Sequence, residues 1–333
     1  MGYDITRLHH VGHIVDDVAQ ALILYERLGF VVPPPSCPAM SLREGAAPEP
    51  FGAANTHADF PRSFLELATC VKVGDTDRLP PGTRLVPLQA PAELLPRLVE
   101  RISETTANLS AFLNRFEGLH ILMFSSPDID ATAARLIAAG VRHGGVNTVR
   151  RAAPPGAATP VETVRYLEID GDEPDARPGS VAEGRVGIVA DLDPDVQGAR
   201  HPGHPNGAVD LVEAVLCVAD QELAAVQQRY ETYLGRPARP KGPARVLDLD
   251  GAALTLVPAS GLAALLPGER PAALPALAGY TVAVRDLAHT HGLLRRNGLA
   301  PRENPSGDLF VPADSALGTA VVFRQAAPPT APA

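Results

Sequence analysis

Apolar runs alternate along this chain with stretches in which apolar residues recur at helical spacing. The first run, residues 10–15, ends at Asp16 and Asp17, and Gly29 closes the stretch that follows. Between them, apolar side chains at intervals of three or four residues form one stripe of a helix: Val18, Ala21, Leu22, Tyr25 and Leu28. The pattern predicts a strand followed by an amphipathic helix.

This order of an apolar run, an aspartate, a helical stretch and a glycine occurs four times. The copies begin near residues 10, 120, 214 and 280, and further short β-like runs follow each helical stretch. We expect the last strand of each copy at residues 64–68, 164–169, 253–257 and 319–323. A unit repeated at this length indicates an array of similar modules. The predicted fold class is therefore α+β, with four βαβββ modules in one chain.

Two such modules can pair their curved sheets into a half-barrel that encloses a cavity. We expect an N-terminal pair over residues 1–172 and a C-terminal pair over residues 209–326. Residues 173–208 are predicted to be a linker, and the Ala- and Pro-rich residues 327–333 a disordered tail. A helix within residues 94–116 is expected to cover the cavity.

The composition limits the partners. A net charge of −9 with no basic block disfavours nucleic acid and anionic membranes, and no apolar run reaches the ~18 residues of a membrane helix. Three cysteines without a metal or disulfide pattern, and a start without a secretion signal, favour the cytoplasm. We therefore expect a cytoplasmic monomer or homodimer whose partner is a small molecule.

A histidine and a glutamate recur at matching places in the first two copies. Glu66 and Glu168 each interrupt an apolar run, where an unpaired charge is costly. His10 and His120 lie in the apolar runs upstream of them. Two imidazoles and two carboxylates on strand-like segments suit one divalent metal ion, which could be Fe, Mn, Ni, Co or Zn.

Other assignments of these residues stay open. His9 and His13 compete with His10, because strand alternation puts His9 and His13 on one face and His10 on the other. The pattern does not say which face lines the cavity. In a purely structural interpretation, the two glutamates point to solvent from a half-exposed sheet.

Asn55 and His57 are candidate substrate-binding residues, because they lie close before Glu66, although a polar turn would use the same residue types. Residues 200–206 contain His201 and His204, and the surrounding prolines favour a rigid linker over a metal motif. In the third copy the corresponding positions hold Glu213 and Thr255, and in the fourth copy they hold Gly279 or Tyr280, and Val321. No second ligand set can be assembled there, so we expect one metal site, in the N-terminal half.

The opening LHHVGHIVDD (residues 8–17) with YERLGF (residues 25–30) resembles the start of a module of the vicinal oxygen chelate superfamily. SFLEL (residues 63–67) and RYLEI (residues 165–169) resemble the closing strand of such a module. The superfamily includes glyoxalase I, methylmalonyl-CoA epimerase, extradiol dioxygenases and antibiotic-resistance proteins. FGAAN (residues 51–55) and HPNGA (residues 204–208) are similar to segments of its glyoxalase-like branch.

The resemblance implies a metal between two paired modules, with ligands on the first and last strand of each. His10 and His120 then fall on the first-strand positions, and Glu66 and Glu168 on the last-strand positions. A metal-bound glutamate, either Glu66 or Glu168, would act as the catalytic base. The implied activity is a metal-dependent lyase or isomerase that forms an enolate-type intermediate of a small oxygen-bearing substrate.

Two alternatives come from other classes of protein. A non-haem Fe(II) dioxygenase of the extradiol type needs two histidines and one carboxylate, which His10, His120 and Glu168 would supply. A non-catalytic binding or resistance protein needs no ligands at these positions and a cavity lined by apolar and aromatic side chains. The aromatic content of 5% disfavours such a cavity.

Overall fold

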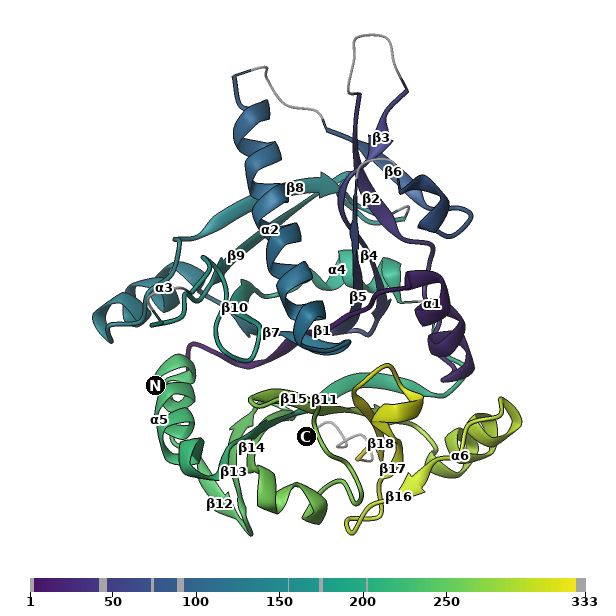
Figure 1. Ribbon diagram of the computed structural model, residues 1–333, viewed down its shortest axis with the longest axis vertical. Coiled ribbons are helices and arrows are strands. Elements are labelled where there is room, and N and C mark those ends of the chain that lie inside the picture. Colours follow the sequence, from purple (N-terminus) through teal and green to yellow (C-terminus); the bar gives the residue numbers. More distant parts are fainter. Residues whose placement is uncertain are drawn as a thin grey trace.

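Four βαβββ modules follow one another along the chain and pair into two curved sheets, as predicted (Figure 1). The computed structural model describes residues 3–41, 47–72, 75–88, 93–154, 156–173, 176–201 and 203–327. The N-terminal pair forms the upper half of Figure 1, in purple to teal, and the C-terminal pair forms the lower half, in green to yellow. The predicted α+β fold is confirmed.

The N-terminal half contains two modules and a connection between them. The first module consists of β1 (Arg7–Ile14), α1 (Val18–Arg27), β2 (Ser36–Met40), β3 (Glu49–Pro50), β4 (Gly52–Asp59) and β5 (Phe64–Val71). The connection contains η1 (Thr76–Arg78), β6 (Arg84–Pro87) and the long helix α2 (Leu95–Arg115). The second module consists of β7 (Gly118–Ser126), α3 (Ile129–Ala138), β8 (Asn147–Ala152), β9 (Val161–Glu168) and β10 (Arg185–Ala190).

The C-terminal half follows the short helix α4 (Pro194–Arg200). Its first module consists of β11 (Ala208–Val218), η2 (Asp220–Glu222), α5 (Leu223–Leu234), β12 (Arg239–Lys241), β13 (Ala244–Leu249), β14 (Ala252–Pro258) and η3 (Ala259–Ala264). Its second module consists of β15 (Ala276–Val284), α6 (Leu287–Arg296), β16 (Arg302–Glu303), β17 (Leu309–Val311), η4 (Ala313–Ser315) and β18 (Ala320–Gln325).

The aspartates of the repeated pattern begin the helices. Asp17 accepts hydrogen bonds from two backbone N–H groups of the first turn of α1, and Asp128 and Asp286 each accept one such bond at the start of α3 and α6. Such caps satisfy backbone donors that have no partner within the helix. The glycine at the other end has a similar role, because Gly235 ends α5 in the left-handed conformation that other residues adopt only at a cost.

Each module closes on itself, because its first strand pairs in parallel with its last. These pairs are β1 with β5, β7 with β10, β11 with β14 and β15 with β18. Two modules join through antiparallel first strands, β1 with β7 and β11 with β15. The N-terminal sheet therefore has the order β4-β5-β1-β7-β10-β9-β8, and one residue pair, Leu119 with Leu277, connects it to the C-terminal sheet.

This strand order corrects one expectation about the second module. Residues 164–169 were expected to form its last strand, but residues 164–168 lie in β9, and β10 is the strand that pairs in parallel with β7. The expected linker over residues 173–208 therefore contains a strand of the N-terminal sheet and the helix α4. Of the predicted tail, residues 328–333 lie outside the described residues.

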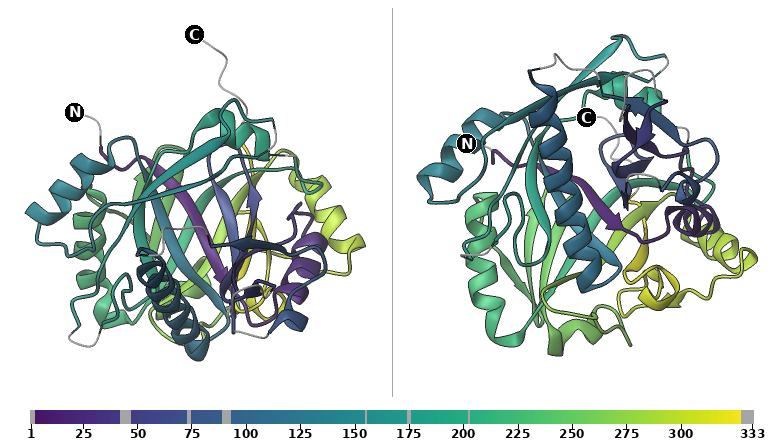
Figure 2. Two further views of the ribbon diagram at one scale, coloured as in Figure 1. Left: turned by 90° about the horizontal axis from the view of Figure 1, so that it is seen from above. Right: turned by 45° about the horizontal axis from the view of Figure 1, so that its top comes forward.

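The two faces of the N-terminal sheet have different neighbours. One face belongs to a core that is continuous with the C-terminal half, where Leu122 and Phe124 of β7 share a cluster with Leu211 and Val282. The opposite face lies under α2, which crosses the strands in both Figure 1 and Figure 2. In the part of the chain that the structure describes, no helix is long and apolar enough to cross a membrane.

Candidate functional site

The candidate site lies on the face of the N-terminal sheet that α2 covers, and we call this face the α2 side. Phe112 of α2 packs there against Ala68, Ile121 and Val189, from three different strands. Side chains alternate along a strand, so residues two positions from these point to the same side. Polar side chains gather beside this apolar cluster: Asn55, His57, Glu66, Glu168 and Arg185.

His10 and Glu66 meet on the α2 side. His10 lies opposite Phe64, and Glu66 lies opposite Gly12, on the adjacent parallel strands β1 and β5. The His10 Nε2 and Glu66 Oε2 atoms are 3.7 Å apart, and both residues are buried. The His10 ring stacks on Phe64 at 4.3 Å, while the Asn55 amide donates a hydrogen bond of 2.9 Å to Glu66 Oε1. Glu66 is thus oriented by Asn55 and presents its second oxygen to His10.

A β-bulge brings His9 to the same side as His10. The pairing of β1 with β7 shifts by one residue between Leu8 and His10, so two successive side chains lean the same way. The Nδ1 atoms of His9 and His10 are 2.7 Å apart, and the N–H of one ring donates a hydrogen bond to the other ring. Burial lowers the pKa of His9 to about 3, and burial with the neighbouring His9 holds the pKa of His10 well below its ordinary value. Both rings are therefore neutral at pH 7.

Glu168 reaches the α2 side from a more distant strand. It lies on β9 opposite Gly187 of β10, and Gly187 lies opposite Met123 of β7, which lies opposite His10. Three strand spacings, roughly 14 Å, separate the backbones of Glu168 and His10. Between them, the Arg185 guanidinium of β10 forms an ion pair with Glu168. The strand β10, which pairs in parallel with β7, has the sequence RVGIVA and therefore contains no carboxylate.

His120 lies apart from this group. A second β-bulge, between Ile121 and Leu119 of β7, contains it. Its ring stacks at 5.3 Å on Phe112 and packs at 4.3 Å against Phe116, and its Nε2–H donates a 2.9 Å hydrogen bond to the Phe116 carbonyl. The side chain is fully buried, and burial lowers the pKa of His120 to about 4. Its neighbour among the histidines is His13, which contacts Tyr25 and the Leu317 carbonyl.

His57 lies opposite Glu66, on β4, and its ring is 4.4 Å from the Phe64 ring. Burial, followed by the charges of Arg151 and Arg200, lowers the pKa of His57 to about 3. Both arginines are ion-paired to Glu162, which is buried. His57 therefore stands as a neutral, partly exposed group between Glu66 and this ion cluster.

The donor set is incomplete for a resident divalent ion. Within the described residues, no three His, Cys, Asp or Glu side chains stand together as ligands. His10 Nε2 and Glu66 Oε2 are close enough to share an ion, but Glu168 is bound to a guanidinium and His120 Nε2 to a carbonyl. Structural and catalytic ions of this type need three or four protein ligands. The side-chain arrangement therefore does not fit the predicted four-ligand site.

His204, and Glu213 of the C-terminal sheet, have structural partners. His204 Nε2–H donates to the Asp59 carbonyl at 2.9 Å, and its Nδ1 accepts from the Val31 N–H at 3.0 Å. Both nitrogens thus tie residues 200–206 to the first module. In the C-terminal sheet, Glu213 accepts a 2.7 Å hydrogen bond from Arg324 and one of 2.5 Å from the Thr255 hydroxyl.

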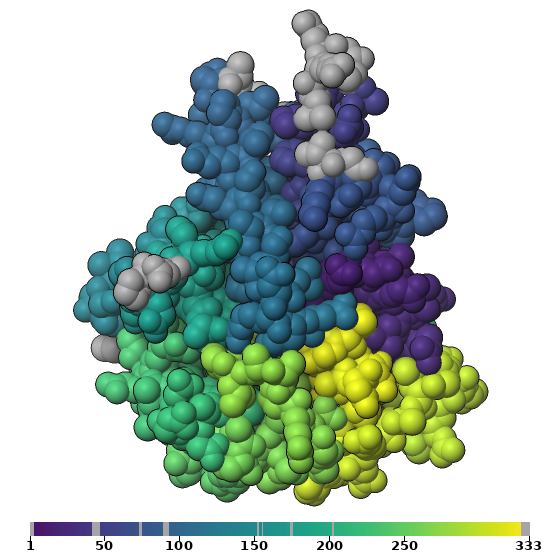
Figure 3. Space-filling view, in the orientation of Figure 1, coloured from purple at the N-terminus to yellow at the C-terminus, as the bar shows by residue number. Residues whose placement is uncertain are grey.

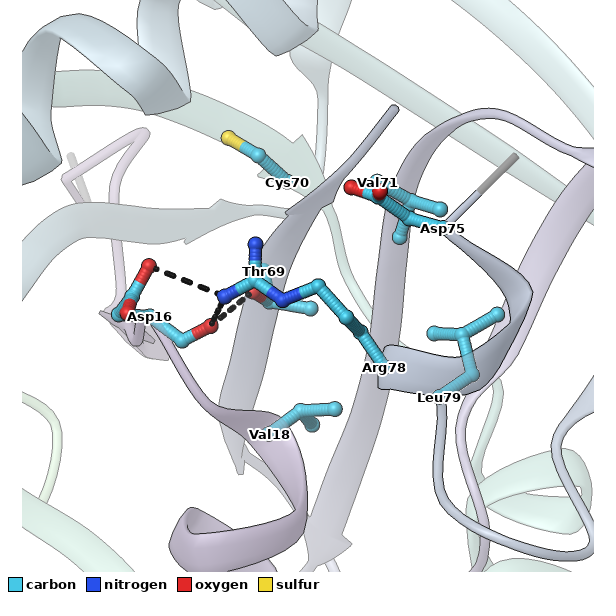
Figure 4. A pocket seen from close by; sticks show the side chains of 8 residues that line it. All are labelled: Asp16, Val18, Thr69, Cys70, Val71, Asp75, Arg78 and Leu79. Atoms are coloured by element: carbon cyan, nitrogen blue, oxygen red, sulfur yellow. Dashed lines mark hydrogen bonds and ion pairs between the residues drawn. The ribbon is translucent and has the colours of Figure 1, made fainter. Parts of the chain in front are cut away.

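A small pocket lies at the start of α1, beside η1. Figure 4 shows Arg78 pointing from η1 toward Asp16, with both hydrogen bonds to Asp16 at 3.4 Å. Val18, Thr69 and Leu79 are among its lining residues. It contains none of the predicted site residues, and its charged pair is exposed, so we do not assign the function there.

Arg185 is the site residue that sequence reasoning missed. Its short strand falls in the segment expected to be a linker, and only the pairing of β10 with β7 brings it to the α2 side. The His9–His10 contact was also missed, because strict alternation assigns the two rings to opposite faces. The run of small and apolar residues in RVGIVA was the available signal for a buried strand.

Solved structures with the same fold have low sequence identity to this chain. A hypothetical protein from Staphylococcus aureus has a TM-score of 0.54 at 10% identity and covers 97% of this chain and 100% of its own. A variant of 4-hydroxymandelate synthase from Streptomyces coelicolor has a TM-score of 0.51 at 14% identity, with coverage of 98% and 95%. The 2,3-dioxygenase LapB from Pseudomonas sp. KL28 has a TM-score of 0.50 at 12% identity, with coverage of 98% and 94%.

These likenesses concern the fold. No curated protein matches the sequence. A family model described as a glyoxalase-like domain matches residues 8–234, which is more than half of the chain and includes both N-terminal modules with the candidate site. The chain therefore belongs to the glyoxalase-like domain family.

Proposed function

We propose that this chain is an enzyme, a glyoxalase-like lyase or isomerase that moves a proton on a small oxygen-bearing substrate. The carrying observation is the pair formed by Glu66 and His10, with Nε2 and Oε2 at 3.7 Å on the α2 side. A buried carboxylate can act as a general base, and a neutral imidazole beside it can accept a proton as well. Both residues come from the first module, so one chain suffices.

Glu66 is the better base of the two predicted glutamates. One of its oxygens accepts from Asn55, and the other, 3.7 Å from His10 Nε2, has no hydrogen bond among those of the described residues. Glu168 is engaged with Arg185 instead. In the proposed step, Glu66 takes a proton from the carbon next to a carbonyl group. The C–H electron pair forms the C=C bond of an enolate while the π pair of the carbonyl group moves to its oxygen, and Glu66 then returns the proton to carbon as the C=O bond re-forms.

The dioxygenase alternative receives less support from the side chains. It requires two histidines and a carboxylate on one face of an iron ion. His10 and His120 lie in different environments, because His10 stacks on Phe64 whereas His120 packs against Phe112 and Phe116. The structural likeness to the 2,3-dioxygenase LapB, at 12% identity, supports the fold alone.

Hydrogen exchange in D₂O tests the proposal. Small 2-oxo and 2-hydroxycarbonyl compounds would be incubated with wild type, with Glu66→Gln and with Glu26→Gln. Proton NMR would monitor the loss of the α-hydrogen signal of each compound. Glu26 is a matched control, because it is exposed on α1. We expect exchange of at least one compound, slowed about 100-fold or more by Glu66→Gln alone. Each set would be run with and without added Mn²⁺, Zn²⁺, Ni²⁺, Co²⁺ or Fe²⁺.

Compounds that bind wild type and Glu66→Gln alike, with no exchange under any condition, would contradict an enzymatic role. That outcome would leave the non-catalytic binding protein as the interpretation.

A further inference from the structure

Arg185 places a fixed positive charge on the α2 side. It follows from the strand pairing that Glu66, Gly12, Ile121 and Arg185 form one row across β5, β1, β7 and β10. Gly12 has no side chain, and Ile121 leans over it, since a Cβ at Gly12 would come within 2.7 Å of the Ile121 side chain. Glu66 and Arg185 stand at the two ends of this row, on the same side of the sheet, with the apolar Gly12 and Ile121 between them.

Both glutamates act on Arg185. Burial by itself would lower the pKa of its guanidinium, but the charges of Glu168 and Glu66 reverse this and raise it. Glu168 contacts the Nε and Nη2 atoms of Arg185. In the row toward Glu66, the next two residues after Arg185 are Ile121 and Gly12, which carry no charge. The positive charge is therefore permanent and lies between the two strands that carry the glutamates.

The guanidinium is within reach of a small molecule. The side chains of Arg185 and Glu168 are 22% and 26% exposed, whereas those of His10 and Glu66 are each 11% exposed. Among the hydrogen bonds of the described residues, Arg185 uses Nε and Nη2 toward Glu168 and none from Nη1. A guanidinium has five N–H donors in a planar fork that matches two oxygens of a carboxylate or enediolate. Figure 3 shows a notch at the upper edge of the molecule, between the upper end of α2 and the purple segment around β3.

We propose that Arg185 acts in place of a divalent ion as the positive group of this site, and binds the anionic oxygens of the substrate. The inference rests on the proposed function and names its substrate class, small molecules with two adjacent oxygens, one of them anionic. When Glu66 removes the proton, the negative charge that develops on the carbonyl oxygen is stabilised by the Arg185 N–H donors. An ion at His10 and Glu66 would instead be repelled by this guanidinium.

Oxalate, a small anion with adjacent oxygens, is the probe. Protein freed of metal ions on a chelating resin would be titrated with oxalate by calorimetry, and separately with Mn²⁺ alone. The variants are Arg185→Met, Arg185→Lys, Glu168→Gln and the control Arg165→Met. Arg165 lies on β9 like Glu168, but its partner is Asp130 on the surface. Circular dichroism would establish that each variant is folded.

We expect metal-free wild type and Arg165→Met to bind oxalate alike, and Arg185→Met to bind it at least about tenfold more weakly, because a charge-assisted bidentate contact is lost. Arg185→Lys should fall between them, since an ammonium group cannot make the planar fork. Glu168→Gln should bind oxalate more tightly, because it frees the guanidinium. This variant keeps the test valid if Arg185→Met fails to fold. Mn²⁺ should bind Arg185→Met more tightly than wild type.

Three outcomes would overturn the inference: oxalate binding that needs a divalent ion, binding that is equal in wild type and Arg185→Met, or no binding under any condition. The outcome of the hydrogen-exchange experiment does not depend on the outcome of the oxalate titration. If oxalate binding depends on Arg185 and no compound exchanges its hydrogen, the anion site stands and the proton-transfer function fails.

Discussion

Glu66 Oε2 lies 3.7 Å from His10 Nε2, on neighbouring parallel strands, whereas the second predicted pair, Glu168 and His120, is separated. The first pair meets because β5 is the strand next to β1. In the second module an additional strand, β10, lies between β9 and β7. The repeated motif of the sequence therefore gives one pair in space and not two.

His120→Ala tests the ligand role that the sequence assigned to His120. We expect a loss of about 2–4 kcal/mol in the free energy of unfolding, because the ring fills a space between Phe112 and Phe116. Metal content by elemental analysis and oxalate binding should equal those of wild type. A divalent ion present in anaerobically purified wild type and absent from His120→Ala would show instead that His120 is a ligand.

Asn55→Ala removes the amide that orients Glu66. A misplaced base loses rate, so we expect hydrogen exchange to slow by about tenfold, less than for Glu66→Gln. An unchanged rate would indicate that Asn55 serves only the pairing of β4 with β5.

His13 makes stability depend on pH. Burial lowers its pKa to about 4, so the folded chain keeps this ring neutral while the unfolded chain takes up a proton below about pH 6.5. Stability is therefore complete above pH 6.5 and falls as the pH drops toward 4, by up to about 1.4 kcal/mol per unit. Urea titrations between pH 7 and pH 4.5 should show that the free energy of unfolding falls less steeply with decreasing pH in His13→Gln than in wild type. An equally steep fall in both proteins would contradict the role of His13 in the pH dependence.

Glu183 connects the two halves of the molecule. It is fully buried, and it accepts hydrogen bonds from Arg229 at 2.7 Å and from the Tyr230 hydroxyl at 2.6 Å. Glu183→Gln leaves the guanidinium without its counter-charge, so we expect a loss of about 3 kcal/mol in urea unfolding. The control Asp130→Asn breaks an exposed pair with Arg165 and should change stability much less than Glu183→Gln does. Equal effects would mean that burial does not strengthen the Glu183 contact.

The local pattern of residues by itself predicted most elements of this protein. The aspartates that precede the helices, the stripe from Val18 to Leu28 and the four copies of the module follow from capping and helical periodicity, which act over a few residues. The meeting of His10 with Glu66 was also accessible, because the first and last strands of the first module are both strongly apolar.

Only the tertiary structure decided the rest of the site. A period of two is the same in every strand, so it cannot tell β9 from β10 or show which of them lies beside β7. Likewise, the two β-bulges that turn His9 toward His10 and set His120 between Phe112 and Phe116 depend on pairing between strands more than 100 residues apart. Arg185 joins Glu66 and Glu168 for the same reason: sheet pairing, a long-range interaction, placed its charge between them.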